Sequence, residues 1–78
     1  MIKLGLYQHY KGLKYELIGI CRHSETLEEL AVYRALYGDY RMWVRPIEMF
    51  KSVVEIDGIT QQRFKFIEPL LSIAPKIR

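Results

Sequence analysis

The chain has 78 residues, of which 50% are hydrophobic and 27% charged, with a formal net charge of +3. This length allows one domain with one hydrophobic core, and the composition is too apolar for a disordered chain. No apolar run approaches the ~20 residues of a membrane-spanning helix, and the first residues lack the apolar stretch of a secretion signal. We therefore expect a cytoplasmic protein without a membrane partner. The single cysteine excludes an internal disulfide.

The N-terminal third predicts a β-hairpin. Residues 6–10 are rich in aromatic side chains, and residues 13–17 alternate apolar and polar side chains as a half-buried strand does. Between them, Lys11-Gly12 predicts a two-residue loop that places His9 opposite Lys14. Gly19 interrupts the alternation and predicts a bulge in the second strand. We expect Cys21, further along that strand, to be a small buried apolar side chain.

Local signals conflict in the next segment. Residues 23–29 are polar and acidic, which indicates a loop. Thr26 followed by Glu29 fits a helix capping box, and Gly38 fits the end of such a helix. Val32 and Tyr33 instead favour a strand. The residues alone support a helix and a strand equally over residues 26–37.

The remaining elements are short and bounded by turn residues. The pattern predicts a turn at 38–40, a strand at 42–45, a helical turn opened by Pro46 over 46–50, and strands at 52–56 and 63–67. Asp57-Gly58 predicts a hairpin. Side-chain alternation requires either Trp43 or Val44 to face the core. These elements predict an all-β fold, a small closed barrel or roll of about five to six short strands.

Several sequence blocks resemble one protein family in their order along the chain. They are Tyr10-Lys11-Gly12, residues 22–26, residues 32–39, residues 43–50, Asp57-Gly58 and Arg63-Phe64. Over about residues 7–67 they are similar to DUF1653, a family of small bacterial proteins classed as a domain of unknown function. The resemblance implies an SH3-like β-roll in which residues 30–37 form a strand, and it implies no activity. Cys21 stands where the family commonly has alanine, which weakens any chemistry based on its thiol.

The organisation follows from these patterns. We expect one SH3-like domain over residues 1–67 and an apolar C-terminal tail over residues 68–78.

The densest polar cluster is His23-Ser24-Glu25-Thr26. These side chains could form a ligand-binding loop, or they could order a turn by hydrogen bonding to the local backbone. Adjacent residues of a strand point to opposite faces, so His23 and Ser24 are poorly placed as base and nucleophile. We therefore assign no catalytic residue.

A second candidate surface lies in the aromatic, arginine-containing stretch of residues 33–50. Most of its aromatic side chains are expected in the core. Arg34, Tyr37, Trp43 and Arg45 could remain exposed and stack bases or grip an extended peptide.

These observations predict a non-catalytic binding module whose partner is a protein, a peptide or a small molecule. Nucleic acid has weaker support as a partner, because no window of five residues is purely basic. No cofactor and no metal are expected, since the phosphate-loop, dinucleotide and zinc-helix patterns are absent. Two alternatives stay open: a small enzyme with a His23/Glu25 acid–base pair, and a homo-oligomeric structural protein, for example a homodimer, docked through its C-terminal tail.

Overall fold

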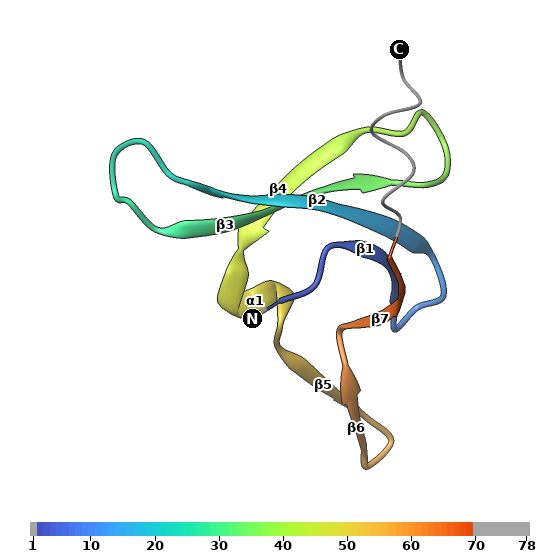
Figure 1. Cartoon of the computed structure of the whole chain (residues 1–78). Coiled ribbons are helices and arrows are strands. Elements are labelled where there is room, and N and C mark those ends of the chain that lie inside the picture. The colour runs from blue at the N-terminus through green and yellow to red at the C-terminus, as the bar shows by residue number, and fades with distance from the viewer. Residues whose placement is uncertain (1, 70–78) are drawn as a thin grey trace.

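The computed structural model describes residues 2–69, which are mostly β-structure (Figure 1). The all-β class and the helical turn after Pro46 are confirmed. There is one strand more than expected, because residues 59–62 form a strand of their own. The elements are β1 (Gly5–His9), β2 (Lys14–Arg22), β3 (Glu29–Ala35), β4 (Met42–Pro46), α1 (Ile47–Phe50), β5 (Val53–Ile56), β6 (Ile59–Gln62) and β7 (Phe64–Glu68).

Five strands form one antiparallel sheet in the order β4-β3-β2-β1-β7. The expected closure into a barrel does not occur in the described chain, because β4 and β7 remain at opposite edges of this sheet. The chain between them forms α1 and then the β5–β6 hairpin, whose strands pair only with each other and project from the body of the domain (Figure 1). The likeness to an SH3 fold stays a prediction.

β2 and β3 form a long hairpin, which resolves the conflict over residues 30–35 in favour of a strand. Leu17 lies opposite Tyr33 and Gly19 opposite Val32, so the register shifts by one residue at the predicted glycine bulge. Beyond the bulge the hairpin extends past the core. Cys21 lies in this extension and is exposed, so the prediction that it is buried was wrong.

Local turn signals predicted one of the two tight hairpins correctly and gave the wrong loop length for the other. Asp57 and Gly58 connect β5 to β6 as predicted, with φ of 52° and 79°. In the β1–β2 hairpin, however, Gln8 rather than His9 lies opposite Lys14. The loop contains three residues and not two, since the His9 N–H donates to the Leu13 carbonyl at 2.8 Å, which leaves residues 10–12 in the loop, with Gly12 at φ 106°.

The core lies under the sheet and is mainly aromatic. The single turn of α1 places Phe50 against Phe64, with ring centroids 4.2 Å apart and ring planes 5° apart. Phe50 also contacts the edges of other core rings. Large aromatic side chains give this short chain apolar area that a small domain otherwise lacks. The buried cluster consists of Tyr7, Leu17, Ala31, Tyr33, Phe50 and Phe64.

No helix within residues 2–69 has the length and apolar character needed to cross a membrane. β7 ends at Glu68, one residue beyond the predicted end of the domain. Most of the predicted apolar tail, residues 70–78, lies outside the described residues.

Candidate functional site

β4 exposes both of its faces along most of its length. Trp43 is 51% exposed and Val44 is 58% exposed, so the side chain predicted to face the core is not buried in it. The alternation rule assumes that a strand is covered on one face. β4 is an edge strand at which the core ends, so Trp43 lies on the core side of the sheet without being covered.

A shallow pocket lies on this side of the sheet next to β4. Its volume is about 190 Å³. Strand pairing assembles it: Tyr33 of β3 lies opposite Trp43 of β4, and Tyr15 of β2 lies opposite the end of β3. We call it the aromatic–arginine pocket, and it is lined by Tyr15, Tyr33, Tyr37, Trp43 and Arg45.

Hydrogen bonds and ring contacts hold the walls of this pocket in place. The Arg45 Nε–H donates to the Tyr33 hydroxyl at 3.2 Å, and the guanidinium carbon lies 5.8 Å from the centroid of Phe64. The hydroxyls of Tyr15 and Tyr37 are 2.5 Å apart. A guanidinium has five N–H donors, so Arg45 retains donors beyond the one that Tyr33 uses. The pocket therefore combines aromatic walls with a positively charged donor.

The pKa values of Tyr15 in the pocket and His9 near it are both shifted in the direction that favours the neutral side chain. Burial, followed by the hydrogen bond with Tyr37, raises the pKa of Tyr15 to about 12. Burial and then the positive charges of Arg45, Lys11 and Arg63 lower the pKa of His9, whose ring lies 6.3 Å from that of Tyr15. At neutral pH, Tyr15 is therefore protonated and offers a hydroxyl rather than a base.

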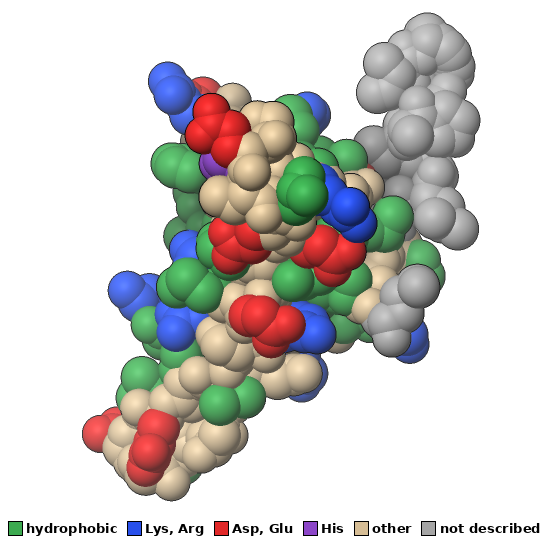
Figure 2. All heavy atoms as spheres, turned by 90° about the vertical axis from the view of Figure 1, so that its left-hand side faces the viewer, with side chains coloured by type: hydrophobic (Ala, Val, Ile, Leu, Met, Phe, Trp, Pro, Cys, Tyr) green, Lys and Arg blue, Asp and Glu red, His purple; other side chains and the backbone are tan. Residues whose placement is uncertain are grey.

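The predicted polar cluster forms the tip of the β2–β3 hairpin, where all its residues are exposed. The Nδ1 atom of His23 accepts the backbone N–H groups of Glu25 at 3.1 Å and Thr26 at 3.3 Å. Thr26 Oγ1 in turn accepts the N–H of Glu28 at 3.2 Å. These bonds order the turn, and the Ser24 side chain makes no hydrogen bond with the described residues. Figure 2 looks onto this end of the molecule, where several acidic side chains lie at the surface.

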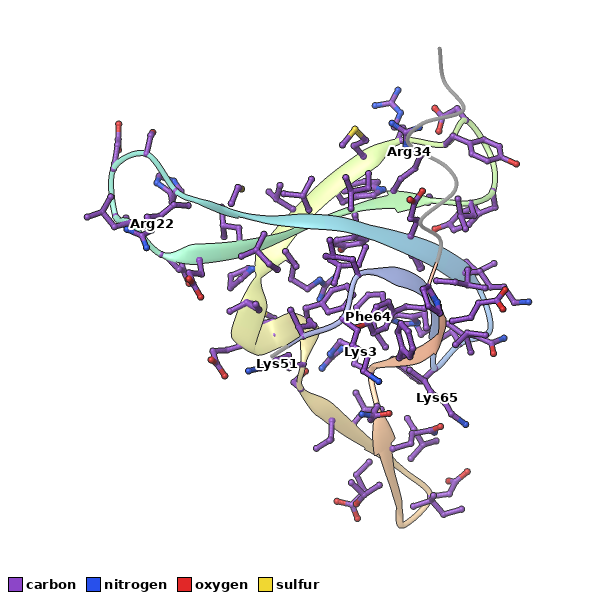
Figure 3. The ribbon with its side chains drawn as sticks, in the orientation of Figure 1. Lys3, Arg22, Arg34, Lys51, Phe64 and Lys65 are labelled. Carbon is purple, nitrogen blue, oxygen red and sulfur yellow. The ribbon has the colours of Figure 1, made fainter. Side chains whose placement is uncertain are left out.

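The structure therefore separates the predicted site residues into three places. The pocket residue of β3, Tyr33, lies four residues after Glu29, where β3 leaves the tip, a distance of about 13 Å at ~3.3 Å per residue. Arg34 follows Tyr33 in a strand and so points to the opposite face. Figure 3 shows Arg34 and Phe64 on opposite sides of the sheet. Only Tyr37, Trp43 and Arg45 come together in one pocket.

Two pocket residues were not among the predicted site residues. Tyr33 belongs to the stretch whose aromatic side chains are mostly expected in the core, and Tyr15 belongs to the predicted half-buried strand of residues 13–17. The available signal was the alternation that places Tyr15 on the same face as the buried Leu17. Elsewhere in residues 2–69, no three side chains of His, Cys, Asp or Glu lie close enough to hold a metal ion.

The fold and the pocket define a small all-β domain built on an open antiparallel sheet with an accessible edge. The family is DUF1653, a protein family of unknown function, whose model matches residues 5–66; the chain belongs to this family. It is similar to the crystal structure of a DUF1653 protein from Bordetella bronchiseptica, with 31% identity and a TM-score of 0.81. The match covers 88% of this chain and 91% of that one. No curated protein matches the chain.

Proposed function

We propose that this chain is a non-catalytic binding module and that the aromatic–arginine pocket is its ligand site. The observation that carries the proposal is the convergence of aromatic side chains and Arg45 on one open pocket. The side chains come from β2, β3, the following loop and β4, and their positions are fixed by strand pairing.

The size of the pocket favours one kind of ligand. Sites that enclose a whole small molecule typically measure about 300–1,000 Å³. The aromatic–arginine pocket, at about 190 Å³, has room for one ring or one side chain. A ligand that uses it must therefore extend beyond it, as a segment of a polypeptide or an oligonucleotide does.

The chemistry of the pocket favours a flat group next to a negative charge. Trp43 and Tyr37 are 51% and 38% exposed, so their rings offer surface for stacking. Among the described residues, Arg45 has no ion pair, which leaves its charge available to a carboxylate or a phosphate. The His23/Glu25 acid–base alternative has no comparable support, since Nδ1 of His23 accepts two backbone N–H groups of its own loop.

Trp43 makes the test direct, because it is the single tryptophan of the chain and lines the pocket. Random-sequence peptides and random-sequence single-stranded oligonucleotides are titrated against the full chain while Trp43 fluorescence is recorded. We expect a bound probe to shift the emission and Tyr37→Ala to weaken binding at least about fivefold, since a stacking contact contributes ~1–3 kcal/mol.

Tyr40→Ala is the matched control, because Tyr40 is exposed nearby but does not line the pocket. It should bind as the parent chain does. Equal losses in Tyr37→Ala and Tyr40→Ala, or binding that leaves Trp43 emission unchanged, would contradict the proposed site. Raising the ionic strength separates the two probes, since binding dominated by phosphate contacts falls steeply with salt.

A further inference from the structure

We propose that the partner of this pocket is an extended acidic peptide that adds to β4 as a new strand of the sheet. The inference rests on the proposed function and names the ligand and its mode of binding. Among residues 2–69, β4 has no strand paired to its outer side and lies beside the pocket, so one peptide can pair with β4 and place a side chain in the pocket.

The backbone of β4 has donors and acceptors directed away from the sheet. The Ala35 N–H donates to the Arg41 carbonyl at 2.9 Å, and the pairing register continues from there without a shift. Hydrogen-bonded and non-hydrogen-bonded pairs alternate in an antiparallel ladder. The backbone groups of Trp43 and Arg45 therefore face β3, whereas those of Met42 and Val44 face outward.

The side chains of β4 alternate between the two faces of the sheet, so a strand paired with β4 would meet both sets. Trp43 and Arg45 lie on the pocket side of the sheet. Met42 and Val44 lie on the other face and are 50% and 58% exposed. A peptide strand beside β4 alternates in the same sense, so it would direct every second side chain toward the pocket and the others toward Met42 and Val44.

The charges around this edge favour an acidic peptide. Arg45 stands on β4, and Arg34 stands on β3 beside Met42. Neither forms an ion pair within residues 2–69, and Nε of Arg34 is buried without a hydrogen-bond partner there. The neighbouring Arg41 pairs with Asp39 at 2.8 Å, in an exposed position. Carboxylates on an added strand would neutralise positive charge on both faces.

Two other occupants of the edge are less suited to it. Pairing of β4 with β4 of a second copy would bring two sets of these arginines together. The C-terminal segment of this chain, residues 70–78, carries Lys76 and Arg78 and no acidic side chain. Both would add positive charge where positive charge is already in excess.

The probe is a synthetic peptide with the core Val-Glu-Val-Tyr-Val, flanked by serine and aspartate. Binding to the full chain is followed by Trp43 fluorescence and by backbone amide NMR shifts. We expect the amides of Met42 and Val44 to shift. N-methylation of the peptide amides that face β4 should weaken binding about tenfold, because backbone hydrogen bonds are lost. N-methylation of a peptide amide that faces away from β4 is the control. Replacing the peptide Glu with Lys should weaken binding more than this control does.

Val44→Pro removes an outward N–H from β4, and Val44→Ala keeps it as the matched control. We expect the first variant alone to lose about tenfold in affinity. Should Val44→Pro fail to fold, the N-methylated peptides decide the question. Binding that depends on Tyr37 but tolerates N-methylation would overturn strand addition and leave the proposed function standing. Probes whose binding never involves the pocket would overturn both the proposed function and strand addition. A dimer that forms through β4 and that Val44→Pro dissociates would show that the occupant of the edge is a second copy of the chain and not a peptide.

Discussion

Phe50 should contribute more to stability than its place in a single helical turn suggests. It is 1% exposed, stacks on Phe64 at 4.2 Å, and contacts Tyr7 and Tyr33 at centroid distances of 5.2 and 5.4 Å. A buried Phe→Ala change costs about 3–5 kcal/mol. A chain of 78 residues has a total stability of about 4–12 kcal/mol. Phe50→Ala should therefore remove at least about a quarter of the free energy of unfolding, and all of it at the low end of that range.

Phe50→Leu retains most of the apolar burial and loses the aromatic pairs, each of which contributes about 0.5–1.5 kcal/mol. We expect it to lower the free energy of unfolding by about 2 kcal/mol. With a urea dependence of about 1 kcal/mol/M for so small a chain, the midpoint of urea unfolding should fall by about 2 M. Far-UV circular dichroism during urea titration measures this shift.

Met49→Ala is the matched control in the same turn, because Met49 is 47% exposed. Its effect should stay within about 0.5 kcal/mol. If the Met49 and Phe50 variants lost the same stability, α1 would not cover the core in the way described here, and the packing argument would be refuted.

Three further predictions concern local features. Gly5→Ala should lower the free energy of unfolding by more than 1 kcal/mol, about the cost of a strained backbone, as measured by urea unfolding. The reason is that Gly5 has a φ of 139° and an added Cβ would lie 2.5 Å from the Glu68 carbonyl oxygen. Gly19→Ala should cost less, because an added Cβ there would have no atom within 4 Å. Burial and nearby cations lower the pKa of His9, so the unfolded chain takes up its proton first and stability falls as the pH drops below about 6.5. His9→Gln should reduce that loss in urea midpoints measured on both sides of this pH, and an unchanged pH dependence would contradict it. Cys21 is exposed, so a thiol reagent should modify it in the native protein without denaturant; protection until unfolding would show that it is covered.

Local signals were sufficient where one or two residues determine the backbone. The glycine bulge at Gly19 and the Asp57-Gly58 hairpin were predicted because these conformations depend on the residues that adopt them. Residues 26–37 could not be assigned in this way. Their helix-capping signals are local, whereas the strand is stabilised by pairing with β2 and β4.

The site was harder to predict than the fold, because strand register brings its residues together. Tyr15 and Tyr37 are far apart in the sequence, yet their hydroxyls form a hydrogen bond. Arg34 was grouped with Trp43 and Arg45 by proximity along the chain, but strand alternation places it on the other face. Pro46, the last residue of β4, was a signal that β4 would be an edge, because a proline has no N–H to donate to a further strand.

Within residues 2–69, β4 offers an unpaired backbone edge beside the aromatic–arginine pocket. Amide hydrogen exchange of the full chain, read residue by residue by NMR, tests this without any ligand. The amides of Trp43 and Arg45, which face β3, should exchange slowly, whereas those of Met42 and Val44 should exchange orders of magnitude faster. Slow exchange at Val44 would mean that the edge is already paired, and the account of β4 as a binding edge would fail.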